Sequence, residues 1–246
     1  MQNPRDFLKD SIRLTIDFSK TDQSRGLPPP PIQKPAPPEA ARIDLPGKEG
    51  WEGVKPVTLV EAIANRRSHR TSTRGDLTLP ELSFLLWATQ GVRQAEGAHH
   101  ALRVVPSAGC RHSFETYIAA FRVAGLKKAF YRYLPLGHQL VEVAAYDNLE
   151  RHVTQMALGQ SFAGRSAATF FWTTIPARME WRYGLAAHKV IALDAGHVCQ
   201  NLYLACEAIG CGTCAIAAYD QDYSDEMLGV DGEEEFTIYM APVSKL

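Results

Sequence analysis

The stretch LAAHKVIALDAGHVCQNLYLACEAIGCG, residues 185–212, predicts the element around which the fold is built. Apolar and small residues recur in it at steps of three and four, the spacing of one helix face: Ile191, Ala195, Val198, Leu202, Ala205 and Ile209. The other positions are also largely apolar or small, so the stretch indicates a central, buried helix from Leu185 to Ile209. At about 1.5 Å per residue, such a helix spans a whole domain.

A polar stripe of Asp194, His197 and Asn201 follows the same spacing on a second face of this helix. An unpaired buried polar group costs about 1–3 kcal/mol, so these side chains need partners. Two solutions stay open: an internal polar network, or a second subunit packed against the helix. We expect His197 to be a satisfied core histidine, and His99 and His100 to lie in a loop.

The composition is that of a globular chain with near-neutral charge. Its 246 residues are 46% hydrophobic, which is enough for one large domain or two small ones. Lys and Arg number 26 against 27 Asp and Glu, a net charge of -1, so neither nucleic acid nor a membrane surface is expected as a partner. No apolar run approaches the ~20 residues of a membrane span, and the N-terminal residues do not resemble a signal peptide, so we expect a cytoplasmic protein.

The chain divides into a Pro-rich N-terminal extension, residues 1–55, and a folded domain, residues 56–246. The extension holds a short amphipathic piece from Phe7 to Phe18 and then two proline runs, which favour extended chain lying on a surface or reaching to a partner. Capping residues and periodicity predict helices after Thr58 and Thr78 and over 149–158 and 224–228, a polar loop over 93–100, and strands over 114–123, 130–134, 139–144, 167–175, 213–219 and 236–243. This mixed order is typical of an α+β domain.

Two segments carry residues suited to an anionic or a flat ligand. Arg66, Ser68 and Arg70 place two guanidinium groups and a hydroxyl beside a predicted helix end, and such fork-shaped donors suit a phosphate. The alternative is a solvated basic helix end. The turn from Pro106 to Gly109 consists of small residues, so its backbone can approach a flat ligand closely, although such a segment can equally be an ordinary turn.

Three further motifs do not have the context that their chemistry requires. Residues 210–215, GCGTCA, satisfy the dinucleotide pattern G-x-G-x-x-A, but they follow a helix and precede a strand, so they indicate a helix C-cap. Residues 211–214 form C-x-x-C without a second cysteine pair or histidines at ligand spacing, so we expect the five cysteines to be small core residues and expect no metal site. Residues 159–163, GQSFA, follow a helix rather than a strand, unlike a nucleophile elbow.

Eight short segments follow one another along the chain in a characteristic order: RRSHR at 66–70, LLWATQG at 85–91, RVVPSAG at 103–109, GL at 125–126, YRY at 131–133, RYG at 182–184, AGHVCQNL at 195–202 and APV at 241–243. This ordered set resembles the nitroreductase family, and more narrowly its SagB/ThcOx-type branch. The resemblance covers residues 56–246, and a proline-rich leader is also usual in that branch.

The resemblance implies a three-layer α+β fold in which helices flank an antiparallel core sheet. It also implies a homodimer with the long helix in its interface and FMN held there. In such enzymes the flavin takes a hydride at N5 from a donor, here expected to be NAD(P)H, and passes electrons to an acceptor.

Carried over by position, the resemblance assigns FMN binding to Arg66, Arg67, Ser68, Arg70, Arg103, Pro106, Ser107, Ala108, Gly109, Gly212, Thr213, Ala217, Ala218 and Lys245. Arg66, Ser68, Arg70 and Lys245 would hold the phosphate and ribityl chain. The turn 106–109 would come from the partner subunit, and residues 217–218 would present a backbone N–H to flavin N5. Arg182 and Tyr183 are the catalytic candidates.

The chain departs from the family pattern at three places. The family often has glycine where Ala217 and Ser244 stand, and members that oxidise peptide azolines carry Lys-Tyr near Arg182-Tyr183. Arginine stays protonated and is a poor general base, which disfavours azoline oxidation by that route.

Three functional hypotheses follow from this reading. The leading one is an FMN-dependent oxidoreductase that reduces small electron-poor acceptors such as nitro compounds or quinones. The second is a SagB-type azoline dehydrogenase that works with a cyclodehydratase in peptide maturation. The third is a protein that binds and stores FMN without turnover.

Overall fold

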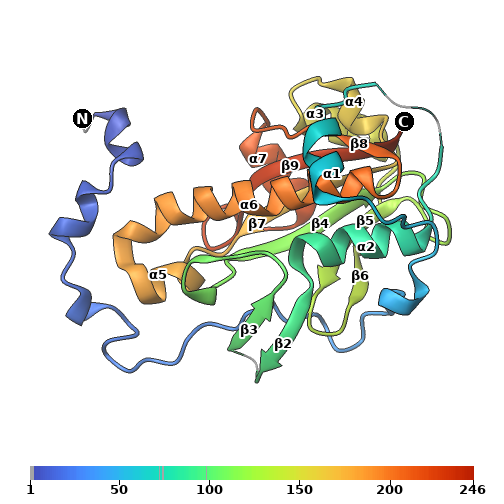
Figure 1. Cartoon of the computed structure of the whole chain (residues 1–246). Coiled ribbons are helices and arrows are strands. Elements are labelled where there is room, and N and C mark those ends of the chain that lie inside the picture. Colours follow the sequence, from blue (N-terminus) through green and yellow to red (C-terminus); the bar gives the residue numbers. More distant parts are fainter. Residues whose placement is uncertain (1–2, 72, 74, 98) are drawn as a thin grey trace.

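A seven-stranded sheet forms the centre of the molecule in the computed structural model, which describes residues 3–71, 73, 75–97 and 99–246 (Figure 1). Its strands are ordered β1-β6-β5-β4-β7-β9-β8, and neighbouring strands are antiparallel. They are β1 (Arg42–Asp44), β4 (Phe114–Ala120), β5 (Ala129–Leu134), β6 (Gln139–Ala144), β7 (Ala168–Thr174), β8 (Cys211–Thr213) and β9 (Phe236–Lys245). Strands β2 (Val92–Glu96) and β3 (His100–Arg103) form a separate hairpin.

Helices cover both faces of this sheet. They are α1 (Leu59–Asn65), α2 (Leu79–Gln90), α3 (Leu149–Met156), α4 (Ser161–Gly164), α5 (Ala177–Tyr183), α6 (Ala187–Glu207) and α7 (Gln221–Leu228), joined by 3₁₀ turns at η1 (Pro4–Leu8), η2 (Ser11–Thr15), η3 (Phe18–Lys20), η4 (Lys48–Gly50), η5 (Ala108–Cys110) and η6 (Gly184–Ala186). Side chains of α2 and α6 share one buried cluster with the sheet, and side chains of α3, α4 and α7 share the other. The predicted three-layer α+β fold with an antiparallel core sheet is therefore confirmed.

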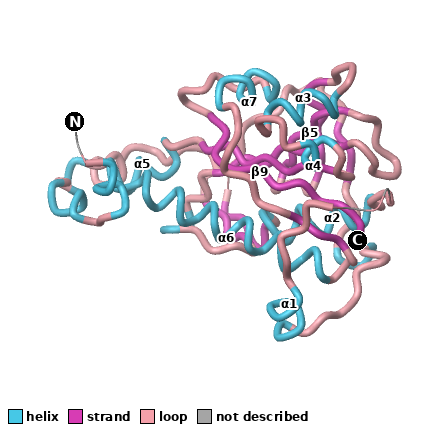
Figure 2. Tube along the Cα trace, turned by 90° about the horizontal axis from the view of Figure 1, so that it is seen from above, coloured by secondary structure: helices cyan, strands magenta, loops and turns pink. Residues whose placement is uncertain are grey.

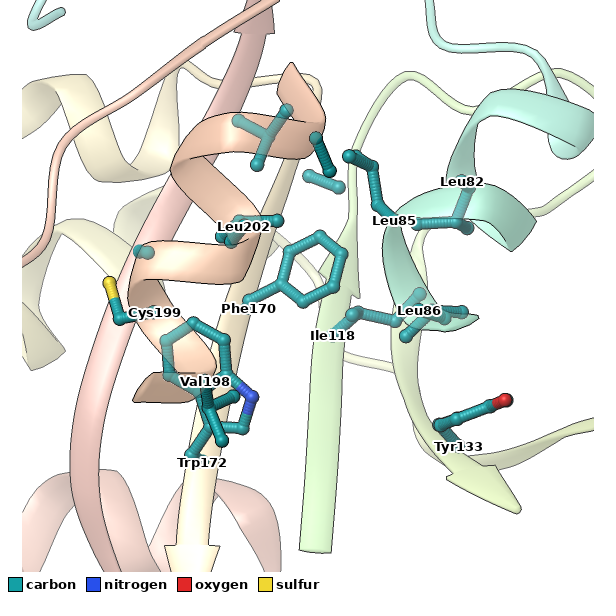
Figure 3. Packing of buried hydrophobic residues seen from close by; sticks show 14 of the residues in the cluster. Leu82, Leu85, Leu86, Ile118, Tyr133, Phe170, Trp172, Val198, Cys199 and Leu202 are labelled. Atoms are coloured by element: carbon teal, nitrogen blue, oxygen red, sulfur yellow. The ribbon is translucent and has the colours of Figure 1, made fainter. Parts of the chain in front are cut away.

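Successive side chains along a strand point to opposite faces of the sheet, so neighbouring strand residues belong to different clusters. Ile118 and Phe170 point toward α2 and α6, whereas their neighbours Tyr117 and Phe171 pack on the opposite face. Figure 3 shows the first cluster, with Leu202 of α6 close to Phe170 and the leucines of α2 facing Ile118. Full burial of each such side chain contributes about 1.5–3 kcal/mol, so this cluster fixes α6 on the sheet.

The central helix α6 is shorter than predicted and is buried on one side only. It runs from Ala187 to Glu207, and the chain leaves it through Gly210, whose φ of 60° is the left-handed conformation of a helix C-cap. One face carries the exposed residues Ala192, Leu193, Gly196, His197 and Gln200. Within a single chain, burial is therefore confirmed for one face only, and burial of the other face by a second subunit stays a prediction. Small and apolar residues fit a subunit interface as well as a core, and periodicity cannot separate the two.

The polar stripe of α6 is divided between these two environments. Asp194 is buried and hydrogen-bonded within the chain, and Asn201 Nδ2 donates to the Ala88 carbonyl of α2 at 2.8 Å. His197 is half exposed, so the prediction of a core histidine was wrong. His99 lies in a turn as predicted, but His100 belongs to β3.

Predicted and observed elements differ mainly where backbone pairing between distant segments determines whether a strand forms. The predicted polar loop over 93–100 is most of the β2–β3 hairpin, and the predicted strand over 213–219 retains only its first residue, because the chain after β8 makes a single bridge from Ile216 to Met240. Helices α4 and α5 were not predicted. The two capped helix starts, at Thr58 and Thr78, are confirmed, each with a complete capping box.

The N-terminal extension packs along the domain for much of its length. Ile32 is fully buried, β1 adds a strand beside β6, and Trp51 packs against Phe84 and Trp87 of α2. The first turns, η1 to η3, instead extend beyond α5 (Figure 2), with apolar side chains such as Leu14 exposed. Residues 21–55 thus contribute to the core of the domain, while the division of the chain at residue 55 stays a prediction.

No helix in the described part of the chain combines the length and the apolar character that crossing a membrane requires.

Candidate functional site

The segment after α1 lies beside the last two strands of the sheet. Ser68 forms a parallel bridge with Thr213 of β8, and the His69 N–H donates to the Thr213 carbonyl at 2.9 Å. A Cβ on Gly212 would come within 2.7 Å of the His69 side chain, so glycine is what allows the two segments to lie this close. Ser68, Gly212 and Thr213, three predicted site residues, are therefore neighbours.

Tyr203 of α6 organises this corner. Its hydroxyl lies 3.0 Å from Ser68 Oγ and accepts the Ala215 N–H at 2.9 Å, and the Arg66 guanidinium lies 5.3 Å from the centre of its ring. It connects the segment after α1, the long helix and the chain after β8. The sequence analysis missed Tyr203, although a tyrosine within an otherwise apolar helix stretch is a signal that its hydroxyl has a polar partner.

Lys245 reaches the same corner from β9. Its backbone pairs with Cys211 of β8, and its carbonyl accepts the Thr73 N–H at 3.0 Å. Its ammonium group, however, lies 2.5 Å from Glu81 Oε1 and also donates to the Ile209 carbonyl at 3.1 Å. Lys245 therefore ties α2, β9 and the end of α6 together, and its charge is paired inside the chain.

The remaining cations of this corner fit an anionic group. Within the described residues the Arg70 guanidinium has no hydrogen-bond or ion-pair partner, and that of Arg66 contacts only the Tyr203 ring. Arg67 is exposed and makes a single long contact, 3.5 Å, to the Ala64 carbonyl. Unpaired guanidinium groups beside a serine hydroxyl form a donor set suited to a phosphate, so these residues fit the phosphate of FMN.

Residues 217 and 218, the predicted neighbours of flavin N5, follow on from this corner. Both are exposed, and the Ala218 carbonyl accepts a hydrogen bond from Gln160 Nε2 at 3.1 Å. The bridge at Ile216 fixes the chain just before them. The backbone of this segment is thus held from both sides while its small side chains stay open to solvent.

The turn over 106–109 lies elsewhere, against α5 and the middle of α6. The Ala108 N–H donates to Asp194 Oδ2 at 3.2 Å, and a Cβ on Gly109 would come within 2.7 Å of Tyr183 Oη and 2.9 Å of Arg182 Cδ. Gly109 also has a φ of 56°, which glycine adopts without steric cost. The structure therefore brings the turn together with Arg182 and Tyr183, the two catalytic candidates.

One chain holds these two groups of predicted site residues apart. The corner formed by Arg66, Ser68, Arg70, Gly212 and Thr213 is called the phosphate corner below. Asp194 lies where α6 meets the turn, and Tyr203 lies where α6 meets the phosphate corner. Nine residues of helix separate them by about 13.5 Å. One chain therefore presents the predicted site residues as two separate groups along α6.

Arg103 has different neighbours from those predicted. Its guanidinium is buried, donating to Gln90 Oε1 and, at 2.6 Å, to the carbonyl of Ile32 in the N-terminal extension. Burial, with a smaller contribution from nearby Arg178, lowers the pKa of Arg103 to about 10. The side chain fixes the extension on the domain.

A buried charge network beneath the extension was not predicted from the sequence. Glu115 Oε1 lies 2.5 Å from Arg178 Nη2, and Glu115 Oε2 lies 3.3 Å from Arg132 Nη1. Glu235 accepts hydrogen bonds from Tyr117, Thr173 and Lys34. Arg132 also donates to the carbonyls of Lys34 and Pro35 at 2.7 and 2.8 Å, so residues 32–35 form a strap over the network.

All five cysteines are free, and Cys199, Cys206, Cys211 and Cys214 are buried, as expected of core residues. Burial raises the pKa of the Cys199 and Cys211 thiols to about 12, which opposes the thiolate form that a redox dithiol needs. The described residues contain no group of three His, Cys, Asp or Glu side chains placed to hold a metal ion.

We therefore expect a thiol reagent such as DTNB to modify at most Cys110, the one partly exposed cysteine, in the native protein. All five cysteines should react after unfolding in guanidinium. The Cys110→Ser variant is the matched control and should lose the native signal. Rapid modification of two or more thiols in the folded protein would contradict the burial of the C-x-x-C pair.

Comparison with known proteins gives concordant results. Residues 63–244 match the model of the nitroreductase family. The putative nitroreductase MJ1384 of Methanocaldococcus jannaschii is 28% identical over 192 residues, which cover 78% of this chain and 93% of that protein. The crystal structure of a putative nitroreductase from Anabaena variabilis superposes with a TM-score of 0.69 at 26% identity, covering 87% of this chain and 43% of that one.

A more distant relative is the trifolitoxin-processing protein TfxB of Rhizobium leguminosarum bv. trifolii, which is 26% identical over 52% of this chain and 36% of its own length. This similarity agrees with the SagB/ThcOx-type resemblance of the sequence. The family match spans most of the folded domain and includes the phosphate corner, the turn and the long helix. The chain therefore belongs to the nitroreductase family.

Proposed function

We propose that the protein is a homodimeric, FMN-dependent oxidoreductase that uses NAD(P)H to reduce small electron-poor acceptors such as nitro compounds or quinones. The observation that carries the proposal is the division of the predicted site residues into two separate groups on α6, one of which holds two guanidinium groups without a carboxylate partner. Membership of the nitroreductase family supports the choice of cofactor.

In this proposal the phosphate corner binds the cofactor. Arg66 and Arg70 would neutralise the phosphate, and Ser68 would donate or accept a hydrogen bond beside it. The exposed backbone at residues 217–218 would offer N–H groups to the edge of the ring. FMN, when bound, supplies the ability to accept a hydride and pass its electrons on.

A second copy of the chain would complete the site. The uncovered face of α6 and the neighbouring helix α1, which projects from the body in Figure 2, expose large apolar side chains: Leu193, Leu59, Val60 and Ile63. Exposed apolar patches of this kind mark interaction surfaces. Packing two copies through this surface would place the turn of one copy near the phosphate corner of the other.

Arg182 and Tyr183 would act on the acceptor. They lie at the end of α5 against the turn, with the Arg182 guanidinium 5.7 Å from the centre of the Tyr183 ring. Arginine remains protonated, so Arg182 would attract the negative charge that develops on a nitro or quinone oxygen. The Tyr183 hydroxyl could donate a hydrogen bond to the same oxygen.

The test is to titrate the purified protein with FMN and then to add NADH or NADPH without oxygen. We expect one FMN per chain, bleaching of its absorbance by one of the two donors, and restoration of the colour by a nitroarene or quinone. A protein that gains no flavin absorbance would refute the proposal. Tight FMN binding without bleaching by either donor would favour the storage hypothesis.

The similarity to TfxB, a trifolitoxin-processing protein, favours a second candidate function: an azoline dehydrogenase within a peptide-maturation complex. Such an enzyme requires a cyclodehydratase partner and a precursor peptide. Incubating the FMN-loaded protein with the cyclodehydratase partner and an azoline-containing peptide should then give a product lighter by two hydrogens, detected by mass spectrometry. An unchanged peptide mass in the presence of the partner, together with nitroarene reduction by the same preparation, would exclude it.

A further inference from the structure

Asp194 of α6 makes a set of contacts that the proposed mechanism does not use. Its side chain is almost fully buried, and Oδ2 accepts the Ala108 N–H at 3.2 Å. Burial raises the pKa of this carboxyl, and the Ser107 hydroxyl opposes the rise. A buried carboxylate that accepts a backbone N–H holds the turn to the long helix.

Ser107, which precedes Ala108 in the turn, supports the chain that follows. Its Oγ accepts the His112 N–H at 3.0 Å. The Asp194–Ala108 contact and the Ser107–His112 hydrogen bond therefore both fix the conformation of this segment.

The turn needs such support because its backbone is in an uncommon conformation. Gly109, Cys110 and His112 have φ angles of 56°, 54° and 48°, and two of these residues are not glycine. Positive φ at non-glycine residues costs about 1–3 kcal/mol and persists only where surrounding contacts enforce it. Asp194 provides contacts on one side of the turn, and the packing of Arg182 and Tyr183 on Gly109 provides them on the other.

Asp194 also faces the uncovered surface of α6. His197 Nδ1 lies 3.7 Å from Asp194 Oδ1, and the His197 side chain is 53% exposed. One carboxylate therefore contacts the turn through one oxygen and, through the other, a residue on the surface where the proposed second copy would pack. A change at that surface can reach the turn through a single side chain.

We propose that Asp194 is a positioning residue that holds the turn 106–110 in the conformation required at the cofactor site. The proposal rests on the function proposed above, since the turn would serve the FMN of a second copy. In this role Asp194 would act through the turn and not through a contact with FMN. Its loss should therefore change how the turn contacts the ring and leave the phosphate corner intact.

The first test compares Asp194→Asn with Asp194→Leu. Asparagine retains an oxygen that can accept the Ala108 N–H, whereas leucine fills a similar volume without an acceptor. We expect Asp194→Leu to weaken FMN binding about tenfold, the size of one lost charge-assisted hydrogen bond, and to alter the visible circular dichroism of the bound flavin. Asp194→Asn should recover most of both properties.

A second measurement separates positioning from a general structural role and does not depend on FMN. Amide hydrogen exchange of the protein without cofactor should show faster exchange at Ala108 and His112 in Asp194→Leu, while amides of the core strand β7 keep their protection. Ser107→Ala is the matched comparison: it removes the acceptor of the His112 N–H and should accelerate His112 while Ala108, which donates to Asp194, stays protected. If Asp194→Leu does not fold, Asp194→Asn carries this measurement with a smaller acceleration at Ala108, because a neutral amide oxygen is a weaker acceptor than a carboxylate.

These measurements distinguish a wrong role for Asp194 from a wrong cofactor assignment. A parent protein that binds no FMN refutes the cofactor assignment, and the exchange pattern then still decides whether Asp194 holds the turn. Unchanged FMN affinity and flavin dichroism in a folded Asp194→Leu variant would overturn the positioning role. Faster exchange spread over the whole chain would overturn it as well, because that result shows general destabilisation.

Discussion

Replacing Arg178 by Met is expected to lower the free energy of unfolding by about 3–5 kcal/mol. Arg178 is almost fully buried, and its Nη2 pairs with Glu115 Oε1 at 2.5 Å. Its removal leaves the equally buried Glu115 with a longer hydrogen bond from Arg132, at 3.3 Å, and one backbone donor, the Lys34 N–H at 2.7 Å. Unfolding in urea, followed by circular dichroism, measures the change.

The controls for this prediction use the same substitution and the same pair. Arg151 is exposed, and Arg151→Met should change stability by no more than about 0.5 kcal/mol. The double variant Arg178→Met with Glu115→Gln should be less destabilised than the sum of the two single variants, because the buried charge disappears together with its partner. Equal stability of Arg178→Met and Arg151→Met would contradict the role of the network.

The double variant Arg66→Ala with Arg70→Ala is expected to raise the Kd for FMN by a factor of ~100 or more. Hydrogen bonds to charged groups contribute about 1.5–3 kcal/mol each, and two are lost. The fold should persist, because within the described residues these guanidinium groups contact only the Tyr203 ring. Quenching of flavin fluorescence measures the Kd, and added salt should weaken binding to the parent more than binding to the variant.

Two further variants serve as controls for this prediction. Arg93→Ala removes a cation on the β2–β3 hairpin, away from the phosphate corner, and should leave the Kd unchanged. Lys245→Met should reduce thermal stability, because it removes the ion-pair partner of the buried Glu81. Unchanged FMN content in the double arginine variant would show that the phosphate is bound elsewhere.

Much of the fold could be predicted because its signals are local. The apolar run of β7 and the capping boxes at Thr58 and Thr78 depend on residues within a few positions of each other, and each element formed within a few residues of its predicted bounds. Strand β1 and the β2–β3 hairpin lack such signals. Short edge strands form because a neighbouring segment offers backbone partners, and that neighbour is not encoded nearby in the sequence.

In the candidate site, too, local residue types could be interpreted from the sequence, whereas contacts between distant residues could not. The residue types at Arg66, Ser68 and Arg70 predicted a phosphate-binding segment, and the family resemblance added Gly212. The structure places these segments side by side. The sequence could not indicate that the ammonium group of Lys245 is paired with Glu81, or that Tyr203 connects the segments of that corner. Such pairings join residues far apart along the chain, so they depend on the completed fold.

The strap formed by residues 32–35 has a consequence for the order in which the chain acquires its structure. Lys34 emerges early during synthesis, but its partner Glu235 lies 201 residues later. Glu115, Arg132 and Arg178 must likewise be in place before the strap can dock. Contacts of such large sequence separation form slowly, because most of the chain must be closed into a loop first. The strap is therefore synthesised before its partners and docks only after they are in place.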